Sequence, residues 1–350
     1  MRIILIIMAI VCLGGCDKKN TSIYHNIIFK EICDIARDKY LPFCIVLIDS
    51  SQHLSQEYYS RLQTRYKFLT QQAIYNMADI NVSVNEWYIK WLCPVTTPLT
   101  CVFSPEGDLV DLIPGATRET FLYSKEAINN LGPTDFHWPN YFHRNKKELI
   151  PLLNNLLEQK EILNQGVYLS SEFSELVDSL NYPYSIYLKL AGELMMHDII
   201  TSQITAKSLL EFESPFSLDL YKNEFITAKK VLDPAFDVAD EPSIRIDKDL
   251  ILLPNCIKNQ TIPIEFPVYN DGNKPLVISK IYMSCSCLKK VIDLDGSIIG
   301  ANDSVVVQFK FTPDIEGEVS RDIFITSNSV STPILHVNIL ASVVSDSKNN

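Results

Sequence analysis

The chain has 350 residues, of which 47% are hydrophobic and 21% are charged, and its formal net charge is −11. Its length predicts two or three domains, and its hydrophobic content is sufficient for compact cores. The acidic balance argues against the basic face that nucleic acid or a polybasic membrane contact requires, so no nucleic-acid partner is expected.

Residues 1–15 have the order of a secretory signal. Arg2 supplies the single charge, and an apolar run follows from Ile3 to Leu13. This run is too short to cross a bilayer, which takes about 20 apolar residues. Residues 13–16, Leu-Gly-Gly-Cys, resemble the lipobox of bacterial lipoproteins. The resemblance implies cleavage before Cys16 and attachment of a lipid, palmitate included, at that residue; an ordinary cleaved signal followed by a chance cysteine is the alternative.

The polar residues 16–22 are expected to form a tether above the membrane. The lipoprotein resemblance implies a place in a bacterial cell envelope, on the periplasmic face or the outer surface. The membrane, reached through the lipid, and an envelope protein are then the expected partners.

Cysteine usage fits an exported chain. Once Cys12 leaves with the signal and Cys16 is lipidated, seven cysteines remain: Cys33, Cys44, Cys93, Cys101, Cys256, Cys285 and Cys287. Because seven is odd, at least one thiol stays unpaired in an oxidising compartment. Apolar neighbours predict buried, inert thiols at Cys33, Cys44 and Cys101.

The hydrophobic periodicity divides the remaining chain into three parts. Residues 23–128 alternate helix and strand patterns, residues 129–240 have helical patterns, and residues 241–345 have strand patterns only. We therefore expect a multidomain protein with an α/β domain, an all-α helical region and an all-β sandwich, followed by a disordered tail at residues 346–350.

In the first part, the run Phe43–Ile48 is apolar at every position, which predicts a strand covered on both faces. The turn Pro105-Glu106-Gly107-Asp108 predicts a hairpin. The other elements expected here are a helix ending before Pro42, a helix over about Ser55–Leu69, a strand near Ala73–Ile80 and a helix over Val84–Leu92.

This order of helices and strands, with Pro98 opening the hairpin, resembles the thioredoxin fold over residues 23–128. Gly107 and Gly115 fall in the matching order. The resemblance implies a cis peptide bond before Pro98; a trans proline at a strand start is the alternative.

Redox-active thioredoxins carry Cys-x-x-Cys after the first central strand, at a helix N-terminus that makes the attacking thiol more acidic. The equivalent stretch here, Asp49–Glu57, has no cysteine. The hydroxyls of Ser51 and Ser55 cannot replace a thiol in disulfide exchange. His53 is expected to be a solvated loop residue. Cys93 lies near Pro98 in the sequence and could approach the position of the missing Cys-x-x-Cys, but a single thiol there is only weak support for redox activity. We interpret this part as a redox-dead thioredoxin-like scaffold or docking surface.

The helical part begins with an aromatic stretch containing His137 and His143, whose spacing favours packing over metal binding. Asn145-Lys146-Lys147-Glu148 predicts a capping box, and Pro151 is expected to kink or shorten the first turn of the helix that follows. Further helices are expected over Glu172–Leu180, Tyr184–Met196, Ser202–Phe212 and Tyr221–Leu232.

The third part alternates apolar and polar residues in short segments separated by turns, which predicts a β-sandwich. Four segments occur in order: Phe266–Ile278, Ser284-Cys285-Ser286-Cys287, Phe311-Thr312-Pro313 with Gly317, and Thr326-Ser327-Asn328. They are similar to the bacterial family called domain of unknown function 1573. The resemblance implies an immunoglobulin-like sandwich related to the ASH and MSP modules; Ser286 replaces the glycine usual between the cysteines.

On a strand, Cys285 and Cys287 would point to the same face, so their sulfurs could meet or share a partner. Three hypotheses remain open. The pair is structural, half-buried or joined in a local disulfide; or it exchanges with other thiols; or, with Met283 on the same face, it holds a soft metal such as Cu(I).

No catalytic triad, paired-carboxylate cleft or phosphate loop is found in the sequence. We expect a non-enzymatic envelope lipoprotein without a cofactor, which acts in protein binding or envelope assembly. The alternative is thiol-disulfide exchange or copper handling through Cys285 and Cys287.

Overall fold

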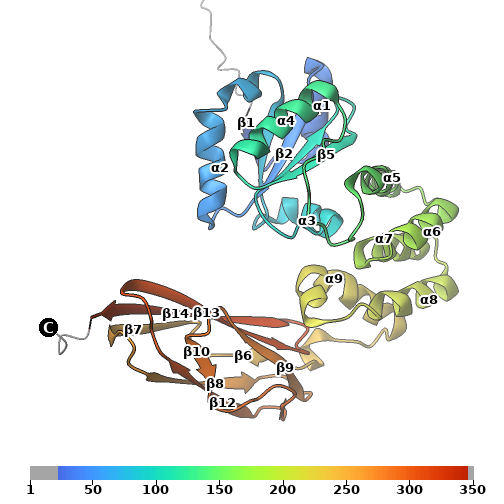
Figure 1. Ribbon diagram of the computed structural model, residues 1–350. Coiled ribbons are helices and arrows are strands. Elements are labelled where there is room, and N and C mark those ends of the chain that lie inside the picture. The colour runs from blue at the N-terminus through green and yellow to red at the C-terminus, as the bar shows by residue number, and fades with distance from the viewer. Residues whose placement is uncertain (1–22, 346–350) are drawn as a thin grey trace, which may run out of the picture. The chain divides into compact units, whose positions relative to one another are not determined.

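The computed structural model describes residues 23–345. The predicted signal, Cys16, the tether and the tail at 346–350 lie outside these residues. The chain divides into two compact units after Pro151 (Figure 1). That division falls inside helix α5, Lys146–Asn164, so the helical part expected at 129–240 is shared between the two units.

The N-terminal unit contains a five-stranded sheet in the order β1-β3-β2-β4-β5. Strands β1, β3 and β2 are parallel, whereas β4 is antiparallel to β2 and β5 is antiparallel to β4. Its elements are β1 Ile23–His25, α1 Phe29–Lys39, β2 Phe43–Ile48, α2 His53–Gln63, η1 Lys67–Gln71, β3 Ile74–Asp79, η2 Ser83–Asn85, α3 Glu86–Leu92, β4 Leu99–Phe103, β5 Leu109–Pro114 and α4 Arg118–Asn130.

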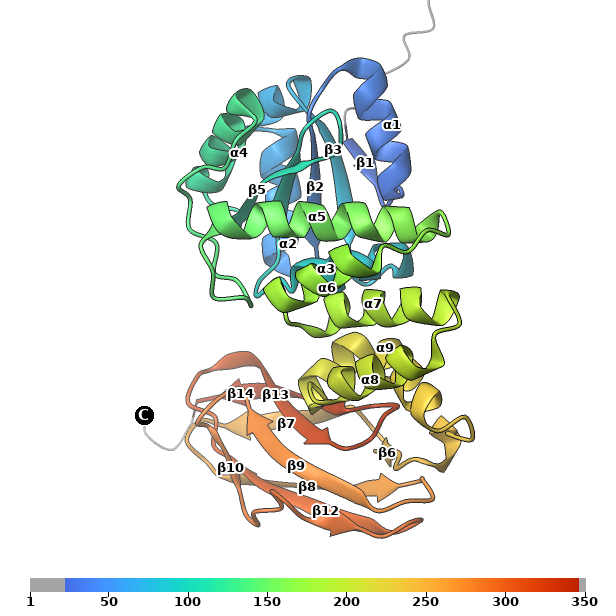
Figure 2. The same cartoon turned by 90° about the vertical axis from the view of Figure 1, so that its right-hand side faces the viewer.

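Strand β2 is central, and the prediction that both of its faces are covered is confirmed (Figure 2). On one face, the Phe43 ring contacts the ring of Phe29 from α1 and stacks on Phe103. On the other face, Cys44 and Val46 belong to an apolar cluster that includes side chains of α2 and α4. The run of apolar residues therefore joins two separate cores.

The predicted hairpin forms between β4 and β5, and the peptide bond between Thr97 and Pro98 is cis. The Pro98 carbonyl accepts a hydrogen bond from the backbone N–H of Gly115, 2.8 Å away. Gly115 has a φ of +85°, a conformation that favours glycine. The helix expected over Ser55–Leu69 is two elements, α2 and η1, because the chain leaves helical geometry at Thr64.

Helix α5 begins at Lys146 and continues through Pro151, so the shortening expected there is wrong. Proline removes one backbone donor near the start of the helix. Burial of Leu149, Leu153, Leu156 and Leu157 outweighs that loss.

The remaining helices precede the sandwich in the C-terminal unit. They are α6 Ser170–Ser179, α7 Pro183–Met195, α8 Ile199–Leu210, α9 Pro215–Leu232 and the short η3 Val238–Asp240. Helix α9 begins earlier than expected because Ser214 and Ser217 form a capping box and Pro215 occupies the first helical position. The early part is set off from the rest by a kink at Tyr221. Within the described residues, no helix combines the length and apolar content that crossing a membrane requires.

The sandwich predicted for the end of the chain is confirmed as two facing sheets. One sheet has the order β10-β12-β8-β6, and the other has the order β11-β9-β13-β14-β7. The strands are β6 Ile244–Arg245, β7 Leu250–Ile257, β8 Ile262–Asn270, β9 Leu276–Met283, β10 Leu288–Lys290, β11 Ile298–Ile299, β12 Ser304–Phe311, β13 Gly317–Ser327 and β14 Ile334–Val344. Alternate side chains of both sheets form one apolar core, which includes Val268, Phe309, Ile323 and Val337.

The turn after β8 is fixed by close backbone approach. A Cβ atom on Gly272 would lie 2.6 Å from the backbone nitrogen of Ser243, so a larger residue would displace the chain there. The fully buried side chain of Asn270 bonds to the same two backbone segments. This turn therefore anchors the start of the sandwich.

Candidate functional site

Cys285 and Cys287 lie in the turn between β9 and β10, so their expected position on a strand is wrong. Strand β9 belongs to the five-stranded sheet and β10 to the four-stranded sheet, and the chain has to cross between the sheets at this point. The two cysteines form a disulfide, with their Cα atoms 5.2 Å apart. Both are half-buried at the edge of the sandwich core.

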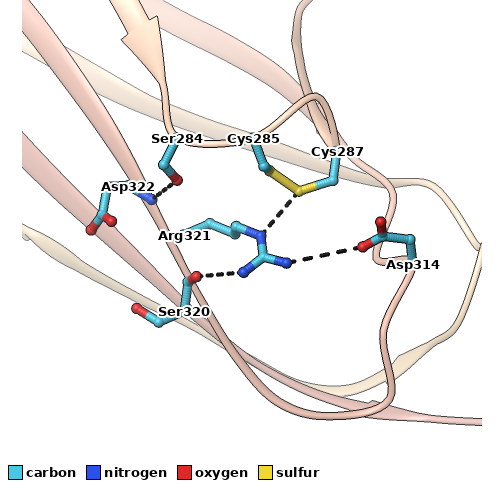
Figure 3. The surroundings of a disulfide bond; sticks show 7 residues. All are labelled: Ser284, Cys285, Cys287, Asp314, Ser320, Arg321 and Asp322. Atoms are coloured by element: carbon cyan, nitrogen blue, oxygen red, sulfur yellow. Dashed lines mark hydrogen bonds and ion pairs between the residues drawn. A yellow bond between two sulfur atoms is a disulfide. The ribbon is translucent and has the colours of Figure 1, made fainter. Parts of the chain in front are cut away.

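Hydrogen bonds hold both ends of this turn, and Figure 3 shows the one between the Asp322 N–H and the Ser284 hydroxyl. The Ser284 N–H donates to the Asp322 carbonyl at 2.9 Å, and the Asp322 N–H donates to the Ser284 hydroxyl at 2.8 Å. At the other end, the Thr312 N–H donates to the Cys287 carbonyl at 2.9 Å. The disulfide is thus fixed to β13 on one side and to the end of β12 on the other.

The guanidinium of Arg321 lies beside the disulfide. Its Nε–H donates to the Cys287 Sγ at 3.2 Å, and a second N–H donates to the Ser320 carbonyl at 2.8 Å. The Asp314 carboxylate is 4.0 Å from the guanidinium, but its side chain is 68% exposed, so solvent screens this pair. A permanent positive charge therefore faces one of the two sulfurs.

Arg321 is absent from the residues that the sequence motifs single out. It lies on β13 at an inward-facing register position, two residues before the buried Ile323 and two after the buried Val319. The alternation of apolar and polar residues along the strand could have singled out Arg321, because a charged residue stands there at a position expected to be apolar. Its partner could not be found in this way, because Cys287 lies 34 residues away.

Met283, Cys285 and Cys287 are all partly buried against the sandwich core. Two of the sulfurs are bonded to each other, however, and a disulfide has no thiolate to bind a soft metal. Over the described part of the chain, no group of three or more His, Cys, Asp and Glu side chains is placed to hold a metal ion.

The other cysteines in the described residues are buried: Cys33, Cys44, Cys93, Cys101 and Cys256. Burial raises the pKa of the Cys44 thiol to about 12, and it also raises the pKa values of Cys101 and Cys256. At neutral pH these three side chains remain thiols, which are poor nucleophiles.

The cysteine-free loop of the N-terminal unit follows β2 and is organised by Asp49. The Asp49 carboxylate accepts hydrogen bonds from the Ser51 hydroxyl at 2.6 Å, the Gln52 amide at 2.9 Å and the Asn81 amide at 3.0 Å. Partial burial opposes ionisation, but these hydrogen bonds outweigh it and lower the pKa of Asp49. His53 is exposed at the first position of α2. The Cys93 thiol, directly after α3, donates to the Lys90 carbonyl of that helix.

A cavity of about 320 Å³ lies near the start of α5, lined by Thr134–Trp138 and Arg144–Lys147. Its lysines are already paired: Lys146 with the Asp111 carboxylate and Lys147 with the Asp135 carboxylate. His137 lines this cavity, but no group of metal ligands is found in the described chain.

The outer face of the five-stranded sheet in the sandwich carries large apolar side chains. Leu252 is 64% exposed, and Tyr282, Phe324 and Leu340 are each 36% to 38% exposed. They form two cross-strand pairs, Tyr282 with Phe324 and Leu252 with Leu340. We call this set of four residues the outer apolar face.

A polar network divides the outer apolar face. His336 stacks on the Phe324 ring, with centroids 4.8 Å apart, and its Nε2 lies 2.8 Å from the Asp322 carboxylate. Asn338 donates to the same carboxylate at 2.8 Å. Burial opposes ionisation of Asp322, but the bonds to His336 and Asn338 outweigh it and lower its pKa.

Fold and site together define the C-terminal part as a two-sheet β-sandwich domain with a Cys-x-Cys disulfide where the chain crosses between the sheets. Residues 244–343 match the family described as "Protein of unknown function (DUF1573)". The resemblance predicted for residues 241–345 is thereby confirmed for the domain.

Three solved structures are similar to about a third of this chain or less. A protein of unknown function from Porphyromonas gingivalis W83 has 17% identity and a TM-score of 0.27, covering 31% of this chain and 50% of its own. The PapD-like domain 7 of human CEP192, an ASH domain, has 10% identity and a TM-score of 0.25; the match covers 32% of this chain and 91% of the CEP192 chain. The MSP family member WR4 from C. elegans has 12% identity and a TM-score of 0.22; the match covers 28% of this chain and 97% of the WR4 chain.

The chain thus spans about half the length of the Porphyromonas protein that it matches. No curated protein sequence matches the chain.

Proposed function

We propose that this chain is a lipid-anchored protein of a bacterial cell envelope, which binds another protein through its C-terminal sandwich and catalyses no reaction. The observation that carries the proposal is the outer apolar face. A solvent-facing sheet surface is normally polar, and large apolar side chains gathered on it mark contact sites. A protein partner would bury Leu252, Phe324 and Leu340 and would surround the polar network of Asp322.

The N-terminal unit acts in this proposal as a thioredoxin-like scaffold without redox activity. The sheet order and the helices on both of its faces support this assignment. Asp49–Glu57 offers hydroxyls, amides and carboxylates but no sulfur, so it cannot exchange disulfides. Cys16 attaches the protein to the membrane and so determines where binding occurs.

Site-specific photo-crosslinking in the cells that make the protein tests this function. A photoreactive amino acid at Leu252 or Leu340 is expected to give a discrete adduct with one envelope protein. The same amino acid at Val306, which is 48% exposed on β12 of the other sheet, is the control and is expected to give none. Phe324→Ala is expected to weaken the adduct about tenfold, because aromatic anchors contribute strongly to interfaces.

Cys16→Ser in the same experiment is expected to move the protein from the membrane fraction to the soluble fraction. Equal adducts from both sheets, or none from Leu252 and Leu340, would contradict binding through the outer apolar face. Retention of the Cys16→Ser protein in the membrane would contradict the lipid anchor but not the binding of a protein partner.

A second candidate function is thiol-disulfide exchange, which the contact between Arg321 and the Cys285–Cys287 disulfide favours. The disulfide is half-exposed, and a neighbouring cation stabilises the thiolate that forms when it opens. If this function holds, the protein accelerates the reduction of insulin by dithiothreitol, measured as turbidity. The double variant Cys285→Ser/Cys287→Ser is then expected to show only the background rate; an equal rate for both proteins would rule the function out.

A further inference from the structure

We propose that Arg321 makes the disulfide asymmetric: it stabilises Cys287 as the leaving thiolate and thereby directs an incoming thiol to Cys285. This inference rests on the second candidate function and takes a dithiol as the substrate. It is carried by the position of the Arg321 guanidinium at the edge of the sandwich (Figure 3).

The contact distinguishes two otherwise similar sulfurs. Both cysteines are half-buried in one four-residue turn, but the Arg321 Nε–H donates to the Sγ of Cys287. The Arg321 side chain is 21% exposed, and its bond to the Ser320 carbonyl fixes the direction of the guanidinium. A cation held in this way is less screened than one in free solution.

The exchange would proceed in two steps that conserve electrons. A thiolate of the substrate dithiol attacks the Cys285 Sγ and forms a mixed disulfide. The bond between the two cysteines breaks, and its electron pair remains on the Cys287 Sγ as a thiolate beside the guanidinium.

The second thiolate of the substrate then attacks the substrate sulfur of the mixed disulfide. Cys285 leaves as a thiolate and takes a proton from solvent. The dithiol has lost two protons to solvent and two electrons to the protein, and it ends as a disulfide. The protein ends with a Cys285 thiol and a Cys287 thiolate.

Arg321 affects the first step because disulfide exchange is faster when the leaving sulfur forms the more stable thiolate. Attack on Cys285 places the leaving charge next to the guanidinium. Attack on Cys287 would place the leaving charge on Cys285, the sulfur to which Arg321 gives no hydrogen bond. The arginine therefore selects the sulfur that is attacked.

Trapping with a monothiol on the full-length protein tests this assignment. The oxidised protein is treated with glutathione, quenched in acid, alkylated and digested with trypsin. The peptide from Ile281 to Lys289 contains Cys285 and Cys287 and no other cysteine, so fragmentation locates the adduct. In the wild-type protein we expect glutathione mainly on Cys285.

Arg321→Gln is expected to give a nearly equal distribution of adducts and to slow opening about threefold to tenfold. The midpoint of thiolate absorbance at 240 nm in the reduced protein should move to higher pH by about one unit. Arg321→Lys keeps the positive charge and should restore part of both the preference and the rate. Arg245→Gln, which removes an arginine paired with Asp247 and Asp271 in the same domain, is the control and should match the wild type.

An unchanged adduct distribution in Arg321→Gln would overturn the proposal. So would an Arg321→Lys protein that behaves like Arg321→Gln in both preference and pH midpoint, because the arginine would then act through packing alone. The insulin assay tests exchange separately. Selective trapping without insulin reduction would rule out the second function and keep the role of Arg321. Insulin reduction without selective trapping would keep the second function and rule out the role of Arg321.

Discussion

Asp111→Leu is expected to destabilise the N-terminal unit by about 3 to 5 kcal/mol, because it leaves a buried lysine without its counter-charge. The Asp111 side chain is fully buried, and the Lys146 side chain is 8% exposed. Their charged atoms are 2.5 Å apart. The same carboxylate accepts hydrogen bonds from the Thr134 N–H at 3.0 Å and its hydroxyl at 2.6 Å.

Urea denaturation followed by tryptophan fluorescence measures this effect in the N-terminal unit. All three tryptophans, Trp87, Trp91 and Trp138, lie before the division at Pro151, so their signal reports this unit. The double variant Asp111→Leu/Lys146→Met should recover much of the loss, because an apolar pair can replace a buried ion pair.

Asp135→Asn provides the matched control. It removes the partner of Lys147, but the Asp135 side chain is 88% exposed, so we expect no measurable change in stability. If Asp111→Leu lowers the free energy of unfolding by less than about 1 kcal/mol, solvent reaches Lys146, and Asp111 and Lys146 do not form the buried ion pair that their geometry indicates.

Asn270→Ala is expected to destabilise the sandwich by about 3 to 5 kcal/mol, because one buried side chain satisfies five backbone groups. Its Oδ1 accepts from the N–H groups of Ser243 and Gly272, at 3.2 and 3.0 Å. Its amide nitrogen lies 2.8 to 3.2 Å from three carbonyl oxygens, those of Lys274, Ile299 and Gly300, so its two N–H groups serve the three with one of them shared. Alanine would remove these five hydrogen bonds, of which two are buried and three are partly buried.

Hydrogen exchange of sandwich peptides, together with the urea midpoint from circular dichroism, measures this loss. Asn270→Asp separates the two halves of the network, since it keeps the acceptor but places a carboxylate against three carbonyl oxygens. We expect it to be no more stable than Asn270→Ala. The exposed neighbour Asn273→Ala should change stability by less than about 0.5 kcal/mol, and an equal effect of both alanine variants would refute the anchoring role.

The two candidate functions use different parts of the sandwich and can be tested independently. Protein binding depends on the outer apolar face, whereas thiol exchange depends on the turn between β9 and β10. Arg321 and Asp322 are adjacent residues of β13, and they contribute to the turn and to the outer face respectively. A partner bound at the outer face would therefore lie close to the disulfide.

Several features could be predicted from the sequence because their causes are local. The apolar run Phe43–Ile48 indicated a strand with both faces covered, and alternation in the last hundred residues indicated a sandwich. The ordered motifs around Asn270 and the two cysteines identified the family of residues 244–343. The three-residue strand β1 was missed, because so short a segment carries no periodicity.

The sequence by itself determined that Cys285 and Cys287 are close enough to bond, since only one residue separates them. Only the tertiary structure decided that they lie in a turn, that they are joined, and that Arg321 faces Cys287. The tertiary structure alone also showed the ion pair between Asp111 and Lys146 and the outer apolar face. Periodicity reports which side of a strand a residue occupies, whereas the partners found there depend on how strands distant in the chain are placed in register.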